Sequence, residues 1–354
     1  MKISVRQICF IMLAYTVVSK LLMYPTNLSL LCGRDLLFPA LINFAVQGAI
    51  VWALAYLCSR TDKTFFQLIE GTLGNITARI VYGLFALFFM VCTIIPIFEQ
   101  KLYVHAIFYD TVPSLLVFLP FFFLAIYAAS KGFENIGRCA DICLPIFLVT
   151  MVFILGMSVL EVKWDSILPV LKTPAKSIFG GSAASLFRFA EPCYLLMFMG
   201  HFKYKKGDAA KITLSYIGGA VIVLFFLFVF YGVYGNISAS RPFAISKISV
   251  FFPAIEMLGR IDLVALYALE VVMLFALVLN IQLAVHCVEK CTGYNNKAIL
   301  SLAVNAVLLI ILVTCDHYFS GIYNLFSKWM WIVFIVFANA VPLLAWTMRR
   351  RERR

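Results

Sequence analysis

Two charged residues stand inside long apolar segments, where they could bind complementary groups of a small molecule. Lys20 interrupts the first apolar run, within residues 19–25, and Glu191 interrupts a later run, within residues 180–192. Each is followed closely by a proline. Hydrocarbon tolerates charge and non-helical backbone only where protein or a water-filled cavity surrounds them. A pair of interrupted apolar segments in corresponding halves of a chain is typical of a secondary transporter's binding site.

Ligand contact at the two breaks would be non-covalent. Half-helix ends offer free amides to a carboxylate and free carbonyls to an ammonium. Lys20 either contacts an anionic group of the ligand or is the structural partner of a neighbouring carboxylate, for which Glu191 is the favoured candidate. We therefore predict unwound backbone near residues 19–24 and 187–191, with the two breaks facing each other. The candidate ligand-binding residues are Ser19, Lys20, Tyr24, Phe187, Phe189, Ala190 and Glu191.

Further charged residues are candidates for ion pairs or gates. Arg188 and Glu191 are spaced i, i+3, so on a continuous helix they would share a face and could pair. Glu270 stands alone in its apolar run. It either pairs with Arg260 near the outer interface or faces a cavity.

Two other charged pairs are expected near the membrane surfaces. Arg138 and Asp141 share one helix face at the inner end of a span, where we expect them to form a structural latch. Glu99 and Lys101 lie near the outer end of another span. We expect both of them at the interface rather than in a functional site.

Metal and covalent chemistry are not indicated. The ten cysteines include no CxxC pair, and the four histidines are scattered. We therefore interpret the cysteines as packing residues and predict no metal site and no cofactor. GxSxG, HExxH and phosphate-binding glycine loops are missing as well, so we predict that the protein is not an enzyme.

Composition places the chain in the membrane. Hydrophobic residues make up 63% and charged residues 13% of its 354 residues, against roughly half and a quarter in soluble domains. The mean hydropathy is +0.98. The formal net charge of +12 is explained by basic loops and a basic tail against lipid headgroups, without nucleic acid.

We predict an all-α integral membrane protein with about ten transmembrane helices, because the apolar runs reach the length that a span needs. Lys and Arg are more numerous in the loops on the side of the two termini. Because cytoplasmic loops carry an excess of Lys and Arg, we expect both termini in the cytoplasm. The ten spans are expected at residues 7–31, 36–58, 79–108, 114–129, 134–160, 177–200, 212–234, 263–287, 298–315 and 328–348.

The spans divide into two halves of five. Residues 1–354 form a single transmembrane domain, with halves at approximately 1–160 and 177–354. Because five is odd, the halves must insert with opposite topology, which is the condition for an inverted repeat. The first helix of each half, helix one and helix six, is the broken one.

Five short segments, in order along most of the chain, resemble one family. They are Ile3-Ser4-Val5-Arg6-Gln7, Cys32-Gly33-Arg34-Asp35, Ile136-Gly137-Arg138-Cys139-Ala140-Asp141-Ile142-Cys143-Leu144-Pro145, Trp164-Asp165-Ser166-Ile167-Leu168-Pro169 and Phe187-Arg188-Phe189-Ala190-Glu191. Together they resemble the B subunits of spore germinant receptors, the GerAB/ArcD/ProY-type permeases.

This resemblance implies a fold and a function. The fold is the five-plus-five inverted repeat of amino acid/polyamine permeases, which is LeuT-like. The function is sensing of a small amino-acid-like nutrient in the spore inner membrane, beside A-type and C-type receptor subunits. The alternative is a proton-coupled permease for an amino acid or another small organic solute.

The chain differs from this superfamily at both breaks. Permeases of the superfamily often carry Gly-Ser-Gly at the first break, where this chain has Val18-Ser19-Lys20, and Ala190 replaces a glycine of the second. Either the ligand differs from a simple amino acid, or Lys20 has taken over contact with an anionic group. Its ammonium would also replace the charge of a sodium ion found in related folds.

Overall fold

The computed structural model describes residues 3–108, 111, 113–168, 170–249 and 261–352, and nearly all of their regular structure is helical. Within these ranges, seven helical stretches are long and apolar enough to cross a membrane. The first half contains α1 (Val5–Val18), α2 (Tyr24–Cys32), η1 (Gly33–Asp35), α3 (Leu37–Cys58), α4 (Phe65–Leu73), α5 (Asn75–Phe108), α6 (Ser114–Ser130), α7 (Phe133–Ser158) and η2 (Val159–Glu161).

The second half begins with the short α8 (Trp164–Ile167). It continues through α9 (Ala175–Ser185), η3 (Leu186–Arg188), α10 (Glu191–Phe198), α11 (Asp208–Tyr234), η4 (Gly235–Ser240), α12 (Ala244–Ser249), α13 (Ile261–Thr292), α14 (Lys297–Thr314) and η6 (Asp316–Tyr318). The last helix comprises α15 (Phe319–Leu325), η7 (Phe326–Met330), α16 (Trp331–Phe334), η8 (Ile335–Ala340) and α17 (Val341–Glu352).

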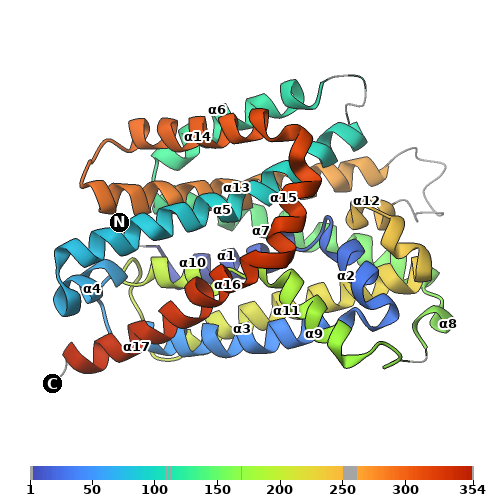
Figure 1. Ribbon diagram of the computed structural model, residues 1–354, viewed down its shortest axis with the longest axis horizontal. Helices are drawn as coiled ribbons and strands as arrows, with labels where there is room; N and C mark the ends of the chain where they lie inside the picture. The colour runs from blue at the N-terminus through green and yellow to red at the C-terminus, as the bar shows by residue number, and fades with distance from the viewer. Residues whose placement is uncertain (1–2, 109–110, 112, 169, 250–260, 353–354) are drawn as a thin grey trace.

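The long helices run roughly parallel in one bundle (Figure 1). α5 packs along α13, α6 along α14, and α3 along α11, while α1 and α10 lie between these pairs. Both chain ends lie at the same end of the bundle as α4, and α8 and α12 lie at the opposite end. The backbone breaks themselves are buried in this bundle, whereas the outer parts α2 and α9 carry exposed side chains such as Leu30 and Phe179.

Most predicted spans agree with helices to within a few residues. The last one does not, because the helix begins at Phe319 rather than at residue 328. Ser327 and Lys328 lower the local hydropathy, but they lie within the π-helical stretch η7 and continue the helix. The short helices α4 and α12 were not predicted, since both are too short to span a membrane. Arg260, a predicted partner of Glu270, lies outside the described residues.

Asp35 in η1 holds the segment before α9 at the end of the bundle opposite the termini. Its buried carboxylate accepts hydrogen bonds from the backbone amides of Leu171 at 2.6 Å and Thr173 at 2.8 Å. Leu171 holds a left-handed conformation, with φ of +62°. Burial raises the pKa of Asp35, but the hydrogen bonds from Thr173 and Leu171 outweigh it and lower this pKa below its usual value.

Replacing Asp35 with alanine is expected to destabilise the protein by about 1–3 kcal/mol for each buried amide left without an acceptor. The matched control is Asp35→Asn, which keeps an acceptor but no charge. Because folding lowers the pKa of Asp35, the advantage of the wild type over Asp35→Asn is full above about pH 4 and falls as the pH drops further. Thermal unfolding at several pH values measures the loss of stability in Asp35→Ala and the pH dependence of the difference between wild type and Asp35→Asn. Equal pH profiles for wild type and Asp35→Asn would contradict the lowered pKa.

Candidate functional site

The first break separates α1 from α2. Residues 19–23 lie between the two helices, and Pro25 in the first turn of α2 has no amide to continue the hydrogen bonding of α1. The Leu22 carbonyl accepts a hydrogen bond from the amide of Ala244, at 3.0 Å. The amide at the start of α12 thus supplies a hydrogen bond to a carbonyl that the break leaves without a helical partner.

The second break separates α9 from α10. The 3-10 turn η3 follows α9 directly, and the chain then changes direction at Phe189, with φ of −116° and ψ of 71°. Ala190 precedes α10, and Pro192 lies in the first turn of that helix. Both breaks lie where the sequence analysis predicted unwound backbone, at residues 19–24 and 187–191.

Lys20 and Glu191 meet between the breaks. Lys20 Nζ lies 2.6 Å from Glu191 Oε1, and both side chains are fully buried. The ammonium also donates to the Thr16 carbonyl at 3.2 Å and to Ser19 Oγ at 3.1 Å. It lies 4.2 Å from the ring centroid of Phe189, close enough for a cation–π interaction. The structure thus brings together the two charges that the sequence analysis paired.

Several polar atoms around this ion pair lack hydrogen bonds. Within the described residues, Glu191 Oε2 and the hydroxyls of Tyr24 and Tyr216 are buried and have no hydrogen-bond partner. Most buried polar atoms in proteins are hydrogen-bonded, so each such atom needs an explanation. A carboxylate oxygen and two hydroxyls can together receive the amine of a small ligand and other polar groups. Tyr216 was not among the predicted residues, because it lies in a charge-free span without any break.

Arg188 does not pair with Glu191. Its guanidinium instead contacts both carboxylate oxygens of Glu99 on α5, through Nη1 at 3.1 Å and through Nη2. It also donates to the Ser19 carbonyl at 3.2 Å and to the Tyr323 hydroxyl at 3.4 Å. The interfacial position predicted for Glu99 is therefore wrong, since its side chain is buried against the two breaks.

Lys101 is also buried rather than interfacial, and it pairs with Asp316. The signal available in the sequence was the unbroken polar triplet of Glu99, Gln100 and Lys101, flanked by large apolar residues. Successive side chains on a helix point in different directions, so the three residues of this triplet can contact different neighbouring helices. Here Glu99 and Lys101 reach different partners, on η3 and η6.

Aromatic side chains cover the Arg188–Glu99 pair. The Phe187 ring lies 5.8 Å from the ring centroids of both Tyr323 and Phe326, in edge-to-face contacts. Tyr323 and Phe326 come from the last helix, far away in the sequence. The broken helices, α5 and the last helix thus close the site on the side away from the termini.

The enclosed space beside the breaks is small. One cavity of about 30 Å³ is lined by Tyr15, Ser19, Glu99, Gln100 and Asn280, among other residues. A second cavity, of about 20 Å³, lies against Ser19 and Arg188. Such volumes accommodate about one water molecule each. A ligand of amino-acid size therefore needs these side chains to move.

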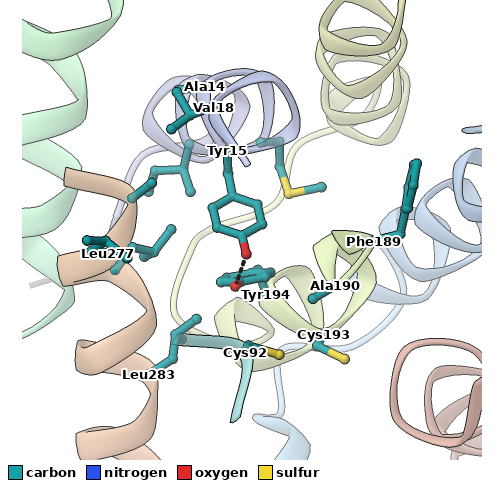
Figure 2. Packing of buried hydrophobic residues seen from close by; sticks show 14 of the residues in the cluster. Ala14, Tyr15, Val18, Cys92, Phe189, Ala190, Cys193, Tyr194, Leu277 and Leu283 are labelled. Carbon is teal, nitrogen blue, oxygen red and sulfur yellow. Dashed lines mark hydrogen bonds between the residues drawn. The ribbon is translucent and has the colours of Figure 1, made fainter. Parts of the chain in front are cut away.

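Buried hydrogen bonds among Tyr15, Tyr194 and Asn280 support the site. The Tyr194 hydroxyl contacts the hydroxyl of Tyr15 and the amide oxygen of Asn280. Figure 2 shows the Tyr15 and Tyr194 rings meeting between the broken helix α1 and α10, with Ala190 and Cys193 on the same short helix. These hydrogen bonds connect α1, α10 and α13, so a displacement of α1 would also disturb α10 and α13.

The end of the bundle that holds the two termini is closed by α1. Asp141 on α7 contacts Arg6 at 3.0 Å and accepts a hydrogen bond from Gln7 at 2.8 Å. Arg138 contacts Glu134 of its own helix at 2.6 Å. Of the two residues predicted to form a latch, only Asp141 connects α7 to α1. Arg138 pairs within its own helix.

Glu270 is buried between α13 and α5. Its carboxyl lies beside the Gln100 side chain, whose amide nitrogen can donate to both of its oxygens at 2.9 Å. The described residues contain no group of three or more His, Cys, Asp or Glu side chains that could hold a metal ion.

Comparison with known proteins identifies the family of this chain. A family model described as spore germination protein matches residues 2–320. The chain belongs to the spore germination protein family. No curated protein sequence matches it at a significant level.

The fold of this spore germination protein is similar to that of a solved transporter structure. The crystal structure of MhsT in complex with L-phenylalanine matches it with a TM-score of 0.69, covering 96% of this chain and 89% of MhsT. The sequences are only 12% identical, so the similarity concerns the fold. The predicted fold class, an all-α membrane protein of LeuT-like type, is confirmed.

Family and fold together establish a coarse function. The spore germination protein is a multi-pass membrane protein with the architecture of a permease. Its family and its fold are those of permeases rather than of enzymes.

Proposed function

We propose that this spore germination protein is the nutrient-sensing B subunit of a germinant receptor and binds a small amino-acid-like ligand between its two broken helices. The observation that carries the proposal is the fully buried Lys20–Glu191 pair, which lies at both breaks and leaves Glu191 Oε2 without a hydrogen bond. A charge pair is costly to bury, and an apolar pair of similar volume would often be at least as stable. A ligand-binding role explains why the charges are there.

The pair suggests how the ligand would be held. The amine of an amino-acid-like molecule would contact Glu191 and the hydroxyl of Tyr216, and its carboxylate would contact Lys20. The amides at the start of α2 would add partial positive charge near that carboxylate. MhsT, which shares the fold, was crystallised with L-phenylalanine, and this supports an amino-acid-like ligand here.

Receptor and permease differ in what happens after binding. A receptor needs two conformations with different ligand affinity and a partner that prefers one of them. A permease must open to both sides in turn. Closure on one side by Arg188 and Glu99, and on the other by Arg6 and Asp141, is compatible with either mechanism. The alternative function is therefore a proton-coupled permease for an amino acid or another small organic solute.

Uptake and germination assays separate the two functions. The purified chain in vesicles is incubated with a radiolabelled mixture of the proteinogenic amino acids, and bound and accumulated label are measured. The receptor function predicts binding without accumulation. It also predicts that spores lacking the A-type or C-type subunit lose the response to the same mixture. Concentrative uptake by the chain, together with a normal response after partner deletion, would establish the permease instead.

The proposed location is the spore inner membrane, with both termini in the cytoplasm. Both ends of the chain lie at one end of the bundle, which is compatible with this orientation (Figure 1). Reporter fusions are expected to place Lys205 and Arg351 on one side and Lys172 and Lys247 on the other, because Lys and Arg favour cytoplasmic loops. Finding Lys172 and Lys205 on the same side would contradict ten spans.

Contacts with the partner subunits are proposed at cytoplasmic segments. The loop at residues 201–211 and the basic tail at residues 349–354 are the candidates, with a solvated surface or a lipid anchor as the other possible roles. Residues 353–354 of this tail lie outside the described part of the chain.

Ligand response is expected to need no sodium. The Lys20 ammonium lies at the break and already places a positive charge beside Glu191. Replacing sodium with choline at constant ionic strength should therefore leave the half-saturating concentration of the amino-acid mixture unchanged in the germination assay. A large sodium-dependent shift would show that Lys20 does not take the place of the ion.

A further inference from the structure

Glu270 is a buried carboxyl whose surroundings differ from those of the other buried acids. Glu191 pairs with Lys20 and Glu99 pairs with Arg188. Within the described part of the chain, Glu270 has no lysine, arginine or histidine within ion-pair distance and contacts the neutral side chain of Gln100 instead. An ionised carboxyl at such a depth is costly without a cation, whereas a carboxyl that carries a proton is not.

The helices around Glu270 offer little compensating charge. On α5, Glu99 and Lys101 are already engaged by Arg188 and Asp316, Tyr103 is a buried phenol, and the half-buried His105 makes no ion pair with Glu270 among the described residues. The charged residues of α1, α6, α7 and α14 stand only at the opposite, inner ends of those helices, where they have any. α12 contributes Lys247, which is half-buried, and makes no ion pair with Glu270 among the described contacts.

The Gln100 amide suits both protonation states of Glu270. In one orientation its nitrogen donates to the two oxygens of the carboxylate, at 2.9 Å each. After a half-turn the amide presents its oxygen, which accepts a hydrogen bond from a protonated carboxyl. A lysine or arginine in this place would favour only the ionised form. A group that gains and loses a proton requires a neutral partner of this kind, which can either donate or accept a hydrogen bond.

We propose that Glu270, held by Gln100, is a proton-binding site of this protein, separate from the Lys20–Glu191 pair. On protonation, an O–H bond forms at the Glu270 carboxylate as an O–H bond of a hydronium ion breaks and leaves water. Release reverses the step. The site rests on the contacts of α5 and α13, so it does not depend on the identity of the nutrient or on the proposed receptor function.

A water-sized cavity lies between Gln100 and the first break. Gln100 lines the cavity of about 30 Å³ together with Ser19 and Glu99. Such a volume accommodates a water molecule that could pass a proton on.

Infrared difference spectra between low and high pH test the proposal on the purified full chain in lipid vesicles. The wild type is expected to show the carbonyl stretch of a buried carboxylic acid that disappears as the pH rises. Glu270→Gln should remove this band. The matched control is Glu289→Gln on the same helix, whose carboxylate lies 3.6 Å from Lys297 and should not contribute. A band that persists unchanged in Glu270→Gln would overturn the proposal.

A second variant keeps the test decisive if Glu270→Gln does not fold. Gln100→Leu preserves the carboxyl but removes the donor to its ionised form. The midpoint at which the band disappears should therefore move upward by about one pH unit, because a hydrogen bond to the charged carboxylate is stronger than one to the neutral acid. An unchanged midpoint would show that Gln100 does not hold a titrating carboxyl.

Discussion

Neutralising Glu191 or Lys20 singly is expected to abolish the nutrient response and to destabilise the protein, whereas neutralising both should restore only stability. Glu191→Leu leaves the buried Lys20 ammonium without its partner at 2.6 Å, and Lys20→Met leaves the carboxylate. Breaking a buried pair in this way costs about 3–5 kcal/mol, but replacing both members by apolar side chains is often neutral. Thermal unfolding of the three purified variants measures these differences.

The double variant decides between binding and structure. If Lys20 and Glu191 bind the ligand, Lys20→Met/Glu191→Leu folds like the wild type but gives spores without a response to the amino-acid mixture. If the pair only stabilises the fold, the double variant responds normally. Protein levels in the membrane are measured in parallel, because loss of a single variant from the membrane explains its loss of response without any role in binding.

Replacing Glu99 with glutamine is expected to open the site from the side opposite the termini. Arg188 then keeps its contacts with Ser19 and Tyr323 but loses the carboxylate that holds it to α5. Removing one partner of such a buried pair costs about 3–5 kcal/mol, part of which is relieved if Arg188 moves toward water. The closed conformation should therefore become less populated, and the site more accessible.

Cys92 reports this opening. Its buried thiol lines the cavity of about 20 Å³ beside Arg188, so in the wild type it should react slowly with a water-soluble thiol reagent. Glu99→Gln should increase the labelling rate at least tenfold, a change that corresponds to about 1.4 kcal/mol in the opening equilibrium. Mass spectrometry assigns the labelled cysteine, and Cys92→Ser provides the background.

The matched control for Glu99→Gln is Asp316→Asn. It leaves the buried Lys101 without its partner, only two residues along α5, but does not touch the broken helices. Equal labelling of Cys92 in the two variants would mean that general destabilisation, and not the Arg188–Glu99 contact, controls access. Unchanged labelling in Glu99→Gln would show that this pair does not close the site.

The membrane class and the positions of both breaks could be predicted from the amino-acid sequence. Apolar runs of spanning length need no tertiary information to be recognised, because lipid demands them of each helix separately. The breaks at residues 19–24 and 187–191 were visible for the same reason, since a charge inside an apolar run is costly in lipid and a nearby proline weakens the helix. Glu191 was the favoured partner of Lys20 by analogy of position alone, because each stands at one of the two breaks.

Only the tertiary structure decided the partners of the remaining charges. The i, i+3 spacing of Arg188 and Glu191 suggested a pair, but that rule assumes a continuous helix. The break at Phe189 turns Arg188 toward Glu99, which is 89 residues distant in the sequence. Asp141 likewise contacts Arg6 of another helix, not its neighbour. Spacing along one helix determines which residues share a face, whereas the packing of helices determines what that face meets.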